Sequence, residues 1–86
     1  MTVTDADVLA DVRTFLEKEF LYMRPDFTLQ DDDSLLKSGV VDSMGVLEVL
    51  DHLEASFGVR AGEDEITNAN LGSLRAIARF VVRKRT

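Results

Sequence analysis

The chain has 86 residues, a formal net charge of −6, 45% hydrophobic residues and no cysteine. Its length allows one folded domain, which we expect to span residues 1–86, and its hydrophobic fraction is too high for a disordered chain. The composition excludes disulfides, thiolate metal sites and a thiol nucleophile, and the acidic charge argues against nucleic acid as a partner. No segment reads as membrane-spanning and no signal peptide opens the chain, so we expect a cytoplasmic protein.

The first predicted helix runs from about Thr4 to about Leu21. Thr4 and Asp7 have the spacing of a capping box, with Asp in place of the usual Glu, and apolar residues then recur at helical spacing. The sequence Arg24-Pro25-Asp26 is expected to end the helix, because the residue before a proline is pushed out of the helical region.

Residues 24–41 show no persistent helical stripe, which predicts a long loop for so small a domain. Loops of this length are usually functional or contain a short turn of their own. We expect such a turn at Asp33-Ser34-Leu35-Leu36, with Leu35 in the core.

The second predicted helix runs from Ser43 to about Phe57, and Gly58 is expected to end it in the left-handed conformation. A short helical turn is expected at residues 66–69. A last helix then begins after Ser73, and its apolar face is made by Leu74, Ile77, Ala78 and Val81. No strand-like alternation occurs, so the predicted fold is all-α: a small four-helix bundle of three main helices and one short helix, with a long loop between helices 1 and 2.

The second predicted helix has two apolar faces. With Ser43 at zero on a helical wheel, the residues between roughly 240° and 340° form a stripe expected to face the core: Val46, Val49, Leu50, Leu53 and Phe57. The residues between roughly 20° and 140° combine two apolar side chains with three acids: Met44, Leu47, Glu48, Asp51 and Glu54. This second face is either ordinary surface or an apolar centre ringed by acid that meets basic partner proteins.

Ser43 stands at the expected start of this helix, directly after Asp42. A serine nucleophile needs a base within hydrogen-bond reach, and the only histidine, His52, lies more than two turns away on the opposite side of the helix. We therefore predict no catalytic residue and no metal site, and we interpret His52 as a surface residue. Asp42 and Ser43 are both good helix caps, but a helix start also stabilises a phosphate attached there.

The sequence resembles the acyl carrier protein family over nearly its whole length. "GVVDSM" followed by "GVLEVLDHLEASFGV" resembles the phosphopantetheine attachment region, "DDDSLLKSG" the loop before the serine, and "ITNANLGSLRAIARFV" the short third helix and the last helix. The resemblance implies a carrier without catalytic activity of its own. It implies a 4'-phosphopantetheine arm that is transferred from coenzyme A to Ser43, with Asp42 as the preceding acid.

The same resemblance implies that Met44, Glu48 and Glu54 contact partner enzymes. Leu47 and Asp51 share the same face of the helical wheel, so we expect all five residues to dock partners. These partners would be a phosphopantetheinyl transferase, an acyl- or aminoacyl-loading enzyme and downstream acyl-using enzymes, and the carrier would be a monomer. Met44, Gly45 and Asp51 depart from the fatty-acid-synthase type. The sequence looks closer to stand-alone carriers for aminoacyl, D-alanyl, polyketide or nonribosomal peptide units. The alternative from the residues alone is an unmodified acidic helical adaptor protein.

Overall fold

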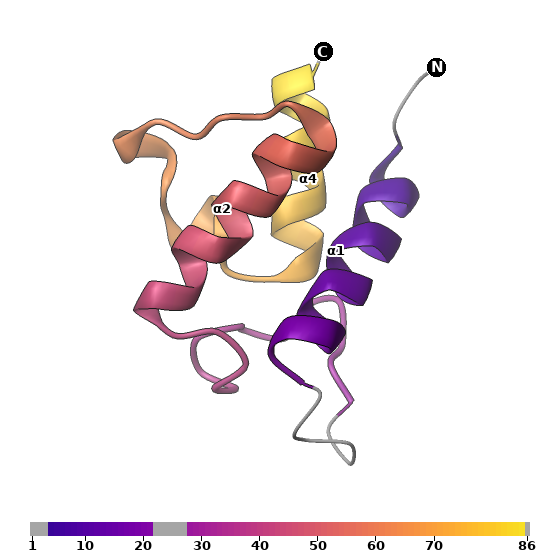
Figure 1. The fold of residues 1–86 in the computed structure, drawn as a ribbon, viewed down its shortest axis with the longest axis vertical. Coiled ribbons are helices and arrows are strands. Elements are labelled where there is room, and N and C mark those ends of the chain that lie inside the picture. Colours follow the sequence, from indigo (N-terminus) through magenta and orange to yellow (C-terminus); the bar gives the residue numbers. More distant parts are fainter. Residues whose placement is uncertain (1–3, 22–27, 86) are drawn as a thin grey trace.

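The computed structural model describes residues 4–21 and 28–85. It contains α1 (Asp5–Glu19), α2 (Ser43–Phe57), a 3-10 turn η1 (Glu63–Glu65), α3 (Asn68–Leu71) and α4 (Leu74–Arg85), and no strand within the described residues. Figure 1 shows α4 behind and between α1 and α2, and α4 packs along α1 and beside α3. The predicted all-α fold of three main helices and one short helix is confirmed.

The helix starts are made by the side chains that the sequence indicated. Thr4 Oγ1 accepts the Asp7 N–H at 3.2 Å, and the Asp7 carboxylate accepts the Thr4 N–H at 3.1 Å, which completes the capping box of α1. Ser73 Oγ accepts the Ala76 N–H at 3.1 Å at the start of α4. At the other end of α2, Gly58 has a φ of 69°, the left-handed conformation expected of a glycine cap.

The core is filled by apolar side chains at helical spacing. The largest side chains that are fully buried are Val8, Val12, Leu16, Leu53, Leu74, Ile77, Phe80 and Val81. Phe80 lies outside the predicted apolar stripe of α4. It is buried because α4 is covered on more than one side, by α1 and by α3, so a wider face of this helix leaves water.

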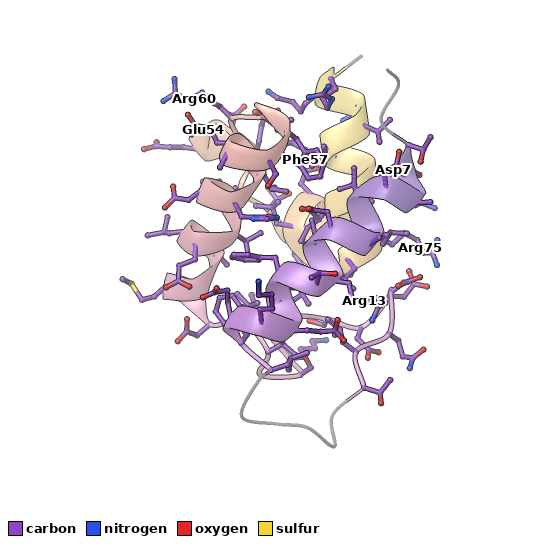
Figure 2. The ribbon with its side chains drawn as sticks, turned by 45° about the vertical axis from the view of Figure 1, so that its right-hand side comes forward. Asp7, Arg13, Glu54, Phe57, Arg60 and Arg75 are labelled. Carbon is purple, nitrogen blue, oxygen red and sulfur yellow. The ribbon has the colours of Figure 1, made fainter. Side chains whose placement is uncertain are left out.

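The loop before α2 is packed onto the bundle. Leu35 is 2% exposed, as predicted, and its N–H donates to the Gly72 carbonyl at 2.9 Å. Arg13 on α1 donates to the Leu29 carbonyl and to the Asp31 carboxylate, and Arg75 on α4 also pairs with Asp31. Figure 2 shows Arg13 and Arg75 on the same side of the molecule. Both helices therefore fix the path of the loop toward α2.

Two predicted boundaries differ from the structure. The expected stop at Arg24-Pro25-Asp26 lies outside the described residues; α1 has already ended at Glu19, with Phe20 as its C-cap. The expected turn at 66–69 was placed too early, since α3 spans Asn68–Leu71. Thr67 Oγ1 accepts the Asn70 N–H at 3.2 Å and so caps a helix that can only begin after it.

Candidate functional site

Ser43 is the first residue of α2, and the residues before it are anchored. Val40 and Val41 are buried in the core, so the chain enters α2 from a fixed point. Asp42 is the N-cap, and its Oδ1 accepts the Gly45 N–H at 2.7 Å. Because the carboxylate of Asp42 already serves as the cap, this helix start has no need of a second capping residue.

The start of α2 suits a phosphate attached to its first residue. The first N–H groups of a helix point out of its N-terminus, and the helix dipole adds partial positive charge there. No Asp or Glu lies in the first turn of α2 after the cap. The residues present therefore fit an arm joined to Ser43 through a phosphate group.

The outer side of α2 is exposed, as its wheel predicted. The side chains of Met44 and Leu47 are 71% and 53% exposed, and the three acids Glu48, Asp51 and Glu54 are exposed along the same side. On the opposite side Leu53 is 1% exposed. Figure 2 shows Glu54 on the outer edge of α2 and Phe57 between α2 and α4. We call Met44, Leu47, Glu48, Asp51 and Glu54 the outer face of α2.

One acid of the outer face has a basic neighbour. Glu54 Oε1 lies 3.4 Å from Arg60 Nε, and both side chains are more than half exposed. No ion pair within the described residues is recorded for Glu48 or Asp51. The negative charge of Glu48 and Asp51 is therefore the part of the face most available to a cationic partner.

The interpretation of His52 as a plain surface residue is wrong. Its Nε2 lies 2.5 Å from Asp11 Oδ2, and its ring stacks on Phe15 with centroids 4.1 Å apart and an interplanar angle of 16°. His52 therefore links α2 to α1. On the helical wheel His52 lies beside the core stripe, which is compatible with a position at the edge of the core. Its partner Asp11 could not be predicted, because it is 41 residues away in the sequence.

An apolar pocket of about 120 Å³ lies between the loop, α2 and α3. Its lining includes Leu35, Val41, Val46, Val49, Ile66 and Leu71. Such a pocket can shelter a small apolar group from water. Sequence patterns did not reveal it, because its walls come from three segments that only the fold brings together.

His52, the one histidine of the chain, lies away from the start of α2. His52 is nine residues along α2, roughly 13 Å of helix rise, and its ring is engaged with α1. Within residues 4–21 and 28–85, no group of three or more His, Cys, Asp or Glu is arranged to hold a metal ion. In the same part of the chain, no helix has the length and apolar character needed to cross a membrane.

The fold is a small helical bundle in which a serine begins a helix whose exposed side is acidic. The family model described as "Phosphopantetheine attachment site" matches residues 7–81, and the chain belongs to this family of phosphopantetheine-binding carrier proteins. Membership implies a covalently attached 4'-phosphopantetheine, a transferase that attaches it and enzymes that handle the acyl cargo. A comparison with curated proteins found no match to the chain.

Proposed function

We propose that the chain is a discrete acyl or aminoacyl carrier, folded as one domain over residues 1–86, whose arm is attached to Ser43. The observation that carries the proposal is that Ser43 opens α2 directly beside the exposed outer face, inside the region that the family model matches. The capping role that would otherwise account for a serine here is filled by Asp42.

The other serines have local roles. Ser73 Oγ accepts a backbone N–H at the start of α4, and Ser34 Oγ accepts the Lys37 N–H at 3.2 Å. Ser38 Oγ donates to the Leu35 carbonyl at 3.3 Å, and Ser56 Oγ lies 3.5 Å from the His52 ring. Ser43 is the one of the five serines of the chain that begins α2 beside its outer face, and this position makes it the proposed site of modification.

The modification needs a base and an activating site supplied by the transferase. The Ser43 hydroxyl oxygen attacks the phosphorus of coenzyme A that bears pantetheine, a base of the transferase takes the hydroxyl proton, and adenosine 3',5'-bisphosphate leaves. When bound, the arm supplies a terminal thiol that can form a thioester, a group that this cysteine-free chain lacks. The first turn of α2 would hold the phosphate end of the arm, and docking would bring a tethered cargo to each enzyme at high effective concentration.

The outer face of α2 is the proposed docking surface. An exposed apolar pair, Met44 and Leu47, gives a partner contact area, and the acids beside it steer partners with basic patches. Exposed charges speed encounter more than they lengthen residence, which suits a carrier that visits several enzymes in turn. We propose that the carrier works as a monomer in the cytoplasm.

The cargo is proposed to be short or polar, as in polyketide, nonribosomal peptide, aminoacyl or D-alanyl pathways. The apolar pocket of about 120 Å³ is smaller than the ~150 Å³ that holds a benzene molecule in an engineered cavity. A pocket of this size suits a short acyl group. The departures at Met44, Gly45 and Asp51 favour the same group of carriers over the fatty-acid-synthase type.

The test is the intact mass of the protein after incubation with coenzyme A and a broad-specificity phosphopantetheinyl transferase. The carrier gains the mass of one phosphopantetheine, whereas the alternative, an unmodified adaptor, gains nothing. Candidate adenylating and acyl-transferring enzymes are then offered to the modified protein. The thioester that forms identifies the cargo class.

A further inference from the structure

The first turn of α2 contains a glycine that neighbouring side chains approach closely. A methyl group on the Gly45 Cα would lie 2.9 Å from Phe20 Cε1, closer than such carbon atoms approach, and 3.0 Å from Val41 Cγ1, tighter than most such contacts, so a neighbour would have to shift. It would also lie 3.3 Å from Asp42 Oδ1, the oxygen that caps α2. Glycine is a poor helix former, so its presence here fits the close approach of these neighbours rather than the needs of the helix.

Phe20 reaches this turn from α1 and is itself braced. It is the C-cap of α1, and its N–H donates to the Leu16 carbonyl at 2.8 Å. Its ring meets Phe15 edge to face, with centroids 6.1 Å apart and an interplanar angle of 72°. Phe15 in turn stacks on His52 of α2. The aromatic rings thus connect α1 to α2 at two points, Gly45 and His52.

Asp42, Val41 and Phe20 enclose the turn that contains Ser43. The hydrogen bond to the Asp42 carboxylate caps the turn at its N-terminal end, and the buried Val41 anchors the chain before the turn. The Phe20 ring approaches the turn from α1, at Gly45. On a helical wheel Gly45 lies roughly 200° from Ser43, so the ring supports the turn from behind the serine. Phe20 does not occupy the outer face where an enzyme would approach.

We propose that Phe20 is a positioning residue for the modification of Ser43. Its close approach to the Cα of Gly45, which carries no side chain, fixes the position of the first turn of α2. This inference rests on the proposed function. Transfer rates depend steeply on the placement of the attacking atom, so a shift of this turn slows the attachment of the arm even where the fold survives. A role of Phe20 in packing alone would change stability without a specific change in that rate.

The experiment compares kcat/KM for arm attachment, followed by intact mass, with the melting temperature of each variant. Phe20→Ala and Gly45→Ala should each lower kcat/KM about tenfold at a temperature where circular dichroism shows them folded. Phe20→Leu covers the case in which Phe20→Ala unfolds. Leu9→Ala is the matched control, because Leu9 is also a partly buried apolar residue of α1 but lies far along the helix from Gly45. It should lower the melting temperature and leave kcat/KM unchanged.

The double variant Phe20→Ala/Gly45→Ala decides between positioning and packing. Removing the ring makes room for the methyl group, so the double variant should be modified faster than Gly45→Ala alone. Two substitutions that lowered kcat/KM independently could not give such a rescue. If the two losses simply multiply, or if Leu9→Ala slows attachment as much as Phe20→Ala, the inference is wrong. If the unaltered protein gains no arm at all, the proposed function itself fails; an arm gained equally fast by every variant overturns only the role of Phe20.

Discussion

At the scale of single residues, Leu53 and Leu47 test the orientation of α2 because they are chemically identical and lie on opposite sides. Leu53 is 1% exposed and Leu47 is 53% exposed. Leu53→Ala should lower the free energy of unfolding by about 2–5 kcal/mol, the usual cost of a cavity in a core. Leu47→Ala should change it by less than about 0.5 kcal/mol, as surface substitutions do. Urea unfolding measures both, and similar losses for the two variants would reject this orientation.

Asp11 is a second residue with a specific prediction. Its carboxylate lies 2.5 Å from His52 Nε2, and side chains in this pair are 41% and 19% exposed. Asp11→Lys should lower the free energy of unfolding by on the order of 1 kcal/mol, because it removes this contact. Glu17→Lys, an exposed acid of the same helix, is the control and should have little effect. Equal thermal shifts for the two variants would mean that the Asp11–His52 contact contributes nothing.

At the scale of elements, the outer face of α2 should govern the rate at which partners dock. Glu48→Lys should slow attachment of the arm or loading of cargo, mainly through a lower association rate, since rim charges act on encounter. Stopped-flow or surface-binding kinetics with the transferase measure this rate. Glu54→Lys should act in the same direction, although it also replaces the ion pair with Arg60 by two like charges.

Controls for the docking face come from salt and from α1. Added salt should weaken docking of the unaltered protein, because exposed charges are screened beyond about 8–10 Å. Leu47→Ala should impair docking with less dependence on salt, since its contribution is apolar. Glu17→Lys changes net charge by the same amount as Glu48→Lys but lies on α1. If it slows docking equally, net charge and not the outer face controls the encounter.

The sequence predicted elements best where both partners of a contact lie close in the chain. Thr4 with Asp7, Asp42 with Gly45 and Ser73 with Ala76 are each three residues apart, so the starts of α1, α2 and α4 were readable. The exposed side of α2 was also readable, because a single helical period defines it.

Features that join distant segments were not predictable. Three such features depend on how the helices are placed in space: the contact of His52 with Asp11, the burial of Phe80 and the close approach of Phe20 to Gly45. The apolar pocket likewise needs three separate segments. The predicted turn at residues 66–69 begins too early, because Ile66 is 40% exposed and precedes the Thr67 cap of α3.

At the scale of the whole molecule, the contact of Glu65 with Lys84 ties η1 to the last turn of α4. The Gly62 N–H and the Lys84 ammonium, which lies 2.9 Å away, lower the pKa of Glu65 below its ordinary value of 4.5. A carboxyl group whose pKa is lower in the folded than in the unfolded state stabilises the fold. The stabilisation is complete at a pH above the pKa of the unfolded state, and it is lost as the pH falls through the pKa of the folded state. The contribution of Glu65 should therefore be present at neutral pH and disappear progressively below about pH 4.5.

The corresponding variant is Glu65→Gln. It should melt at a lower temperature than the unaltered protein at neutral pH, and the difference should shrink as the pH falls below about 4.5. Glu63→Gln is the matched control in the same turn, because Glu63 is exposed and should change the melting temperature little at either pH. A difference for Glu65→Gln that stays constant with pH would contradict the assignment of this ion pair.

Attachment of the arm to Ser43 is tested by the mass of the chain, and of its fragments, after reaction with coenzyme A and a phosphopantetheinyl transferase. The unaltered protein should gain one phosphopantetheine, located by fragmentation on Ser43. Ser43→Ala should gain none while keeping its helical circular dichroism. Ser73→Ala, which removes the serine at the start of α4, should still gain the arm. An arm found on Ser43→Ala, or on any other residue of the unaltered protein, would contradict the account.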